Sequence, residues 1–129
     1  ARANERIGRN GMYLRVYWGG AALMLRADLE LRAQSGGRQS LGTALEQLSR
    51  CCASEERRWS AQEIIVRLDE VTGTTVFSEL VLGQFASDGY PDYEAVLARA
   101  GVKLEGAQVQ FDAYAPWAAE RDALMRPAR

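Results

Sequence analysis

The sequence predicts an all-α, five-helix, bundle-like domain, and three observations point to this fold class. Apolar residues recur at helical spacing over most of the chain, most clearly over 41–52. Cap residues and glycines interrupt this pattern at short intervals. The two-residue alternation that is typical of strands occurs only near 109–111. At 129 residues the chain is long enough to bury its own core.

The first expected helix covers 14–34. Between 18 and 25 it carries no charged residue, so this part is expected to be buried on most sides. Further along it becomes amphipathic, and Asp28 and Arg32 can pair at a four-residue spacing. The glycine pair at 36–37 ends this helix, because glycine tolerates the left-handed conformation found at helix ends.

Three further helices follow from local start and stop signals. Ser40 is the expected N-cap of a helix over 41–52. The capping box at 60–63, Ser-Ala-Gln-Glu, begins a third helix, which Gly73 ends. One of the two threonines at 74–75 is expected to cap the fourth helix.

The pattern of apolar and polar residues changes in the last third of the chain. Asp92 is expected to cap a short helix over 93–100, which Gly101 ends. Alternation of apolar and polar residues permits a short strand near 109–111. Pro116 then begins a last amphipathic turn or two.

These signals divide the chain into three segments. Residues 1–12 form a polar lead-in, 13–102 form the helical subdomain, and 103–129 form a C-terminal extension. The chain begins without methionine, which predicts that it is trimmed or is a piece of a longer protein.

The balance of charges excludes some kinds of partner. The chain has 16 basic and 17 acidic residues and a net charge of −1. This balance gives no electrostatic reason to expect nucleic acid or an anionic membrane surface as a partner. The chain also lacks an apolar run of about 18 residues, so no membrane-spanning helix is expected.

The two cysteines, Cys51 and Cys52, are adjacent. A disulfide between neighbours is strained, and two thiols do not make a zinc site. We therefore expect unpaired thiols, with Cys52 packed in a helix core and Cys51 at its edge. Unpaired thiols favour a reducing compartment, which here means the cytoplasm.

The absence of histidine restricts the possible chemistry. It excludes Ser-His-Asp and Cys-His catalysis and the paired histidines of zinc peptidases. The sequence shows no EF-hand spacing and no phosphate-binding loop. We therefore expect neither a metal site nor a cofactor site within this chain.

Tyr17 is the one catalytic candidate that remains. A phenol at the start of a buried helix is held by packing, and Gly19 and Gly20 beside it leave space for a substrate backbone. Its hydroxyl can donate a hydrogen bond to a carbonyl oxygen that gains negative charge. The alternative is structural: Tyr17 covers a core and bonds a backbone carbonyl.

Three blocks together resemble the glycyl aminopeptidase family of zinc metallopeptidases. They are Tyr-Trp-Gly-Gly at 17–20, Asp-Leu-Glu-Leu-Arg at 28–32 and Ser-Gly-Gly-Arg-Gln-Ser-Leu at 35–41. Phe77 and the segment 91–102 are also similar to that family. The resemblance covers roughly 13–102. Gly19 departs from it, since the family usually has lysine there.

The resemblance implies a function for the chain. It would be the helical C-terminal subdomain of a thermolysin-like catalytic domain, with zinc held by His-Glu-x-x-His upstream of the region matched here. Tyr17 would donate a hydrogen bond to the oxyanion. The implied partners are the N-terminal remainder of the parent protein and a peptide substrate. The alternative is a non-catalytic helical scaffold or partner-binding domain from a degenerate family member.

Overall fold

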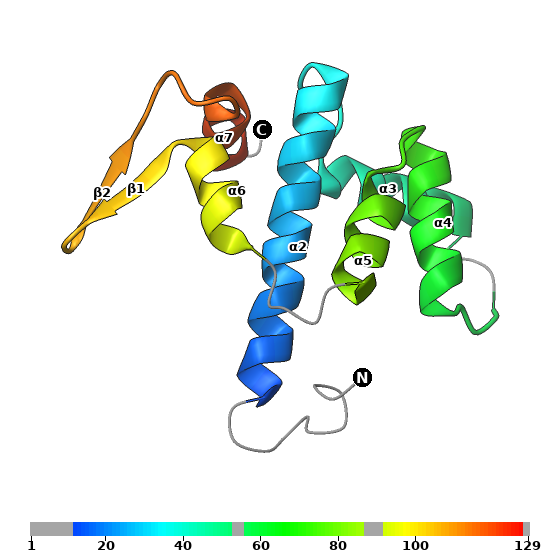
Figure 1. Ribbon diagram of the computed structural model, residues 1–129. Helices are drawn as coiled ribbons and strands as arrows, with labels where there is room; N and C mark the ends of the chain where they lie inside the picture. The colour runs from blue at the N-terminus through cyan, green and yellow to red at the C-terminus, as the bar shows by residue number, and fades with distance from the viewer. Residues whose placement is uncertain (1–11, 53–55, 87–91, 128–129) are drawn as a thin grey trace.

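The computed structural model describes residues 12–52, 56–86 and 92–127, with the side chains of 12–17 and of 85–86 left out. The elements in chain order are α2 (Met12–Ser35), α3 (Leu41–Cys52), α4 (Ala61–Thr72), α5 (Val76–Ala86), α6 (Tyr93–Ala100), β1 (Val102–Glu105), β2 (Gln108–Phe111) and α7 (Ala118–Met125). Figure 1 shows their arrangement.

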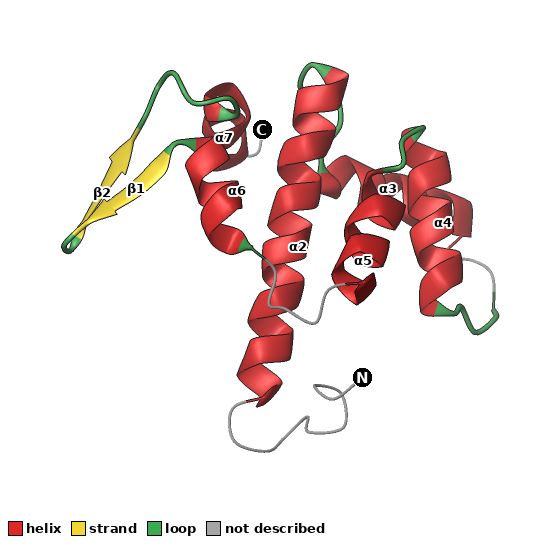
Figure 2. Cartoon of the chain, viewed as in Figure 1, coloured by secondary structure: helices red, strands yellow, loops and turns green. Residues whose placement is uncertain are grey.

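The all-α class is confirmed, because helices dominate the described residues and the strands form one two-stranded hairpin (Figure 2). The count differs from the prediction, since six helices are present in the described ranges rather than five. Strand β1 was not predicted. Its sequence, Val-Lys-Leu-Glu, alternates apolar and polar residues as β2 does, and the two strands pair antiparallel.

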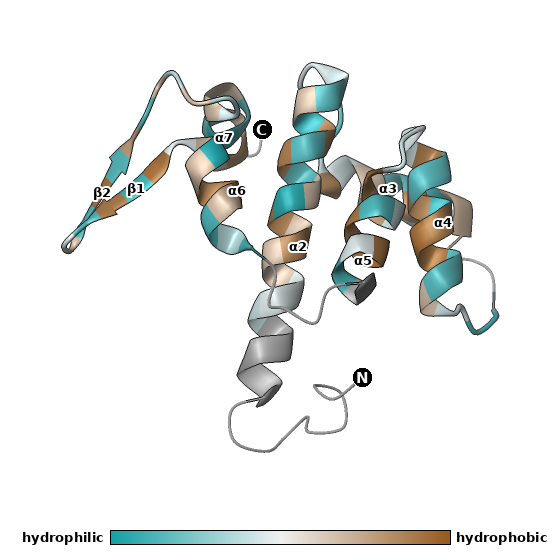
Figure 3. Cartoon of the chain, in the orientation of Figure 1, coloured by the Kyte–Doolittle hydropathy of each residue, from teal (hydrophilic) through white to brown (hydrophobic). Residues whose placement is uncertain are grey.

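Helix α2 lies between two groups of elements (Figure 1). On one side α3, α4 and α5 form what we term the α3–α5 side. Partly buried leucines and isoleucines pack around its core. The core itself consists of six buried residues from α2, α3, α4 and α5: Ala27, Leu31, Ala44, Leu68, Val76 and Phe77. Figure 3 shows apolar residues on these helices.

On the other side of α2 lie α6, the hairpin and α7, which we term the α6–α7 side. Its smaller core contains Leu29, Val96, Ala100 and Trp117. The predicted boundary at 102/103 falls inside β1, whose first residue, Val102, packs against this core.

Local caps begin and end several helices as predicted. Ser60 and Glu63 form the reciprocal capping box of α4, and Gly73 ends this helix at a φ of 64°. The Asp92 carboxylate accepts a hydrogen bond from Ala95 N at the start of α6, and Gly101 ends it at a φ of 74°. These signals lie within a few residues of the ends they define, so they could be read locally.

The start of α5 has the predicted threonine cap and a second cap that was not predicted. The two carboxylate oxygens of Asp69 accept hydrogen bonds from Phe77 N at 2.9 Å and from Ser78 N at 3.2 Å. The Thr74 hydroxyl accepts a longer bond from Val76 N, at 3.4 Å. The stronger cap therefore comes from the preceding helix, α4.

The N-terminal part of α2 is more exposed than the sequence predicted. Trp18 is 58% exposed, and Gly20 and Ala21 are also exposed. The prediction of burial on most sides is wrong for these residues. In Figure 1 this end of α2 extends past the ends of α5 and α6.

The prediction of two unpaired thiols is also wrong. Cys51 and Cys52 are joined by a disulfide at the end of α3. Both cysteines belong to the last turn of α3. Cys52 is buried and Cys51 exposed, as expected. The expectation of a reducing compartment depended on unpaired thiols, which the described cysteines do not have.

Candidate functional site

Tyr17 lies in the second turn of α2, but its side chain falls outside the described part of the structure. The environment of its neighbours is described. Gly19 is buried and Gly20 exposed, and a Cβ added to Gly20 would have no atom within 4 Å other than those of its own helix backbone and its chain neighbours. The backbone at Gly20 therefore leaves open space, which agrees with the idea that another chain could approach there.

The long helix is fixed to the next one by Asp28. Its Oδ2 accepts a hydrogen bond from Arg32 Nε at 2.8 Å, which confirms the predicted pair. Its Oδ1 accepts another from Leu41 N, at 2.7 Å, at the start of α3. Asp28 is only 6% exposed, so both bonds lie in a partly desolvated region where they are strengthened.

The chain turns sharply between these two helices. Gly36 and Gly37 have φ values of 64° and 84°, as their predicted role requires. Ser35 Oγ accepts a hydrogen bond from Gln39 N at 2.8 Å. The Gln39 side-chain amide in turn donates to the carbonyl oxygen of Thr72 at 3.0 Å. The sequence blocks at 28–32 and 35–41 therefore together fix the connection between α2 and α3.

A cleft of about 400 Å³ opens between α2, α5 and α6. It begins at Ala22, a little more than one helical turn beyond Tyr17. Apolar side chains line part of it, and the charged residues at its wall are Arg26, Glu30, Glu79 and Asp92.

The charged groups at this cleft are engaged within the protein. Arg26 Nε lies 3.0 Å from Glu30 Oε1, and Thr75 Oγ1 donates to Glu79 Oε1 at 2.9 Å. Asp92 caps α6. Three carboxylates and one guanidinium give the wall a negative balance, so the cleft suits a cationic or hydrogen-bond-donating group better than an anion.

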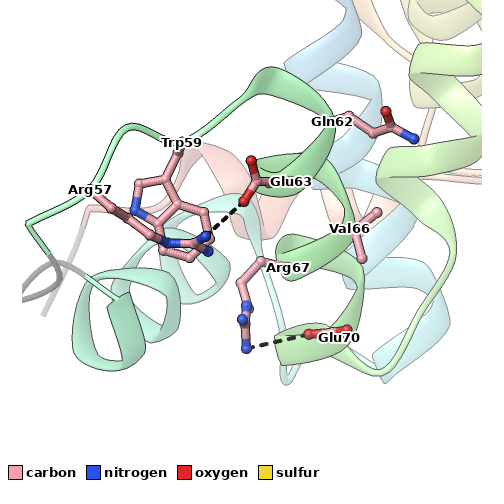
Figure 4. A pocket seen from close by; sticks show the side chains of 7 residues that line it. All are labelled: Arg57, Trp59, Gln62, Glu63, Val66, Arg67 and Glu70. Carbon is pink, nitrogen blue, oxygen red and sulfur yellow. Dashed lines mark hydrogen bonds and ion pairs between the residues drawn. The ribbon is translucent and has the colours of Figure 1, made fainter.

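A second pocket, of about 290 Å³, lies at the start of α4 (Figure 4). The Arg57 guanidinium stacks 3.6 Å from the centre of the Trp59 ring, and Arg57 Nη1 lies 2.9 Å from Glu63 Oε2. On the other wall, Arg67 pairs with Glu70 at 3.5 Å. Each guanidinium therefore has a carboxylate partner.

Glu63 joins this pocket to the capping box. Hydrogen bonds from the Ser60 backbone and side chain, together with the Arg57 guanidinium, lower the pKa of the Glu63 carboxyl from its ordinary value of 4.5. The ionised form is the one that caps α4. The Glu63 carboxylate of this pocket therefore contributes to the cap at the start of α4.

The residues present do not fit a zinc ion. The chain contains no histidine, and the described residues include no group of three or more His, Cys, Asp or Glu side chains that could hold a metal. Among the described helices, none has the length and apolar character needed to span a bilayer.

Neither a scan against protein-family models nor searches of curated proteins and of solved structures find a match to this chain. The family resemblance therefore rests on the quoted blocks alone. Sequence reasoning missed the α2–α5–α6 cleft, since it brings together residues from three separate helices, and it also missed the Trp59 pocket, whose lining residues all lie within 57–70. The one local signal for the second was the closeness of Trp59 to the capping box.

Proposed function

We propose that this chain is the helical part of a zinc-dependent aminopeptidase of the glycyl aminopeptidase type. It would adopt the place of the C-terminal helical subdomain in thermolysin-like peptidases and line one side of the substrate cleft. The observation that carries the proposal is the exposure of Trp18, Gly20 and Ala21 at the start of the uncharged stretch 18–25 of α2.

A large indole at 58% exposure, next to exposed Gly20 and Ala21, offers an apolar contact area. Contiguous apolar surface of this kind marks places where other protein packs. In the proposal, the N-terminal remainder of the catalytic domain packs there.

The proposed chemical role belongs to Tyr17. Its hydroxyl would donate a hydrogen bond to the carbonyl oxygen of the scissile peptide as negative charge develops on that oxygen. The fixed joint at Asp28 supports this role, because it holds α2 against α3 and so limits movement of the helix that carries Tyr17. Zinc would polarise the same bond, and its ligands would come from residues outside this chain.

The substitution Tyr17→Phe in the longer protein that contains this chain tests the proposal. We expect kcat for an aminoacyl p-nitroanilide to fall on the order of a hundred-fold with little change in KM, as for the loss of one oxyanion donor. Tyr114→Phe is the matched control, since Tyr114 is 96% exposed and undergoes the same chemical change. An unchanged kcat in Tyr17→Phe would return Tyr17 to a structural role.

The chain by itself supplies a second test. It should neither bind zinc tightly at one equivalent nor hydrolyse the same substrate, because it lacks a ligand set. Tight stoichiometric zinc binding together with hydrolysis would contradict the proposal that it is one part of the site.

The α2–α5–α6 cleft favours one alternative, a helical domain that binds a peptide or partner without chemistry. Under this alternative, peptide binding is weakened by Leu23→Asp in the cleft and is unaffected by Tyr17→Phe. The sequence upstream of Ala1 distinguishes the two as well: His-Glu-x-x-His supports the enzyme, and its loss supports the binding domain.

A further inference from the structure

The hairpin of β1 and β2 has one apolar and one polar face. The register pairs Val102 with Phe111 and Leu104 with Val109, so these four side chains share a face. The opposite face carries polar or charged residues only: Lys103, Glu105, Gln108 and Gln110. Leu104 is 70% exposed, and Val109 and Phe111 are each 53% exposed.

The outer edge of β1 is uncovered in the described part of the chain. Apart from its partner β2, β1 contacts only α6, and Figure 1 shows the hairpin projecting away from the helices. Glu105 and Gln108 flank the two-residue turn and form the hydrogen-bonded closing pair expected there. Alternation of the ladder then directs the backbone N–H and C=O groups of Leu104 outward.

The charges beside Leu104 are complementary to those of a second copy. If two β1 strands pair antiparallel about a two-fold axis at Leu104, Lys103 of each chain faces Glu105 of the other. The Glu105 carboxylate is already held on this polar face by Gln110 Nε2, at 3.1 Å. A lysine on an edge strand normally discourages pairing with another strand. Here Glu105 of the second copy lies opposite Lys103 in this one register, so the two charges attract.

We propose that a second copy of this chain occupies the β1 edge through that pairing. The product is a four-stranded sheet in the order β2–β1–β1–β2, with the two Leu104 side chains opposite each other on a continuous apolar face. Four residues a strand make a small interface, so the association depends on protein concentration. The proposal is independent of Tyr17 and of any peptidase activity.

Charge reversal tests the proposal by sedimentation equilibrium over a range of concentrations. Lys103→Glu and Glu105→Lys each place like charges opposite each other twice in the dimer, and each should weaken self-association about ten-fold. The double variant K103E/E105K restores both pairs and should associate like the unmodified chain. An equimolar mixture of the two single variants should also associate, because both cross-pairs in the mixed dimer are then attractive.

Two controls separate the pairing from net charge. Arg126→Glu and Glu94→Lys make the same charge changes at exposed positions away from the hairpin and should leave association unchanged. Three outcomes would overturn the proposal: a chain that stays monomeric at every concentration, single variants that associate as well as the unmodified chain, or a mixture that fails to associate while both variants remain folded by circular dichroism.

Discussion

The two sides of α2 are stabilised in different ways. The core cluster of the α3–α5 side contains six buried apolar residues from four helices, and Phe77 and Leu31 within it are completely inaccessible. The core cluster of the α6–α7 side contains four, and one guanidinium lies among the backbone carbonyls of that side. Apolar volume dominates the first side, whereas hydrogen bonding to backbone is prominent in the second.

Arg121 is the centre of that hydrogen bonding. Its side chain is 7% exposed, and Nη1 donates to Ala100 O at 2.8 Å and to Asp112 O at 3.0 Å. It therefore joins α7 to the end of α6 and to the end of β2. Asp122 partly balances its charge, at 2.9 Å. The difference teaches that a side with a small apolar core can be stabilised by one buried guanidinium that donates hydrogen bonds to backbone carbonyl oxygens.

The largest expected effect is at the centre of the α3–α5 side. Phe77→Ala removes a fully buried ring and should lower the free energy of unfolding by about 3–5 kcal/mol, measured by urea denaturation. Phe111→Ala is the control, since this ring is half exposed and should cost about 1 kcal/mol. Equal losses in the two variants would contradict the dominance of apolar burial on this side.

The second effect tests the α6–α7 side. Arg121→Met keeps much of the side-chain volume and leaves the carbonyls of Ala100 and Asp112 without this donor, at a cost of about 2–3 kcal/mol. Hydrogen exchange should accelerate most in α6, the hairpin and α7. Arg126→Met, at an exposed position, is the matched control. Faster exchange confined to α3–α5 would show that the comparison is wrong.

The smallest effect concerns acid stability of the α3–α5 side. Because the pKa of Glu63 is lowered in the folded state, its ionised form stabilises the fold above the unfolded pKa, and this contribution is lost as the pH falls through the folded pKa. In Glu63→Gln this pH-dependent component below about pH 4.5 should be absent. Arg57→Met should reduce it without removing it, since the hydrogen bond from Ser60 N to the Glu63 carboxylate remains. A pH profile of unfolding that is unchanged in both variants would contradict the assigned causes.

The ends of the helices could be predicted because their signals are local. Ser60, Glu63, Asp92 and Gly101 act within four residues of the ends that they define. Asp28 is instructive because half of its role was predictable. Its bond to Arg32 follows from helical spacing, whereas its bond to Leu41 N depends on how the chain turns back. The Asp69 cap of α5 could not be foreseen for the same reason.

The candidate site was less accessible to sequence reasoning. The absence of charge between 18 and 25 predicts burial, but hydrophobicity does not say which chain covers these residues. Tyr17 was selected by residue type and neighbours, and its side chain lies outside the described residues. The cleft required α2, α5 and α6 to come together, which no local pattern encodes.

The position of Trp117 has a consequence for the order of folding. It packs in one cluster with Leu29, which precedes it by 88 residues (117 − 29). The α3–α5 core, in contrast, joins helices that follow one another along the chain. Closing a long loop loses more chain entropy and slows folding. We therefore expect α2 to α5 to assemble first and the C-terminal third to close last, as a late step that rapid-mixing fluorescence of Trp117 would detect.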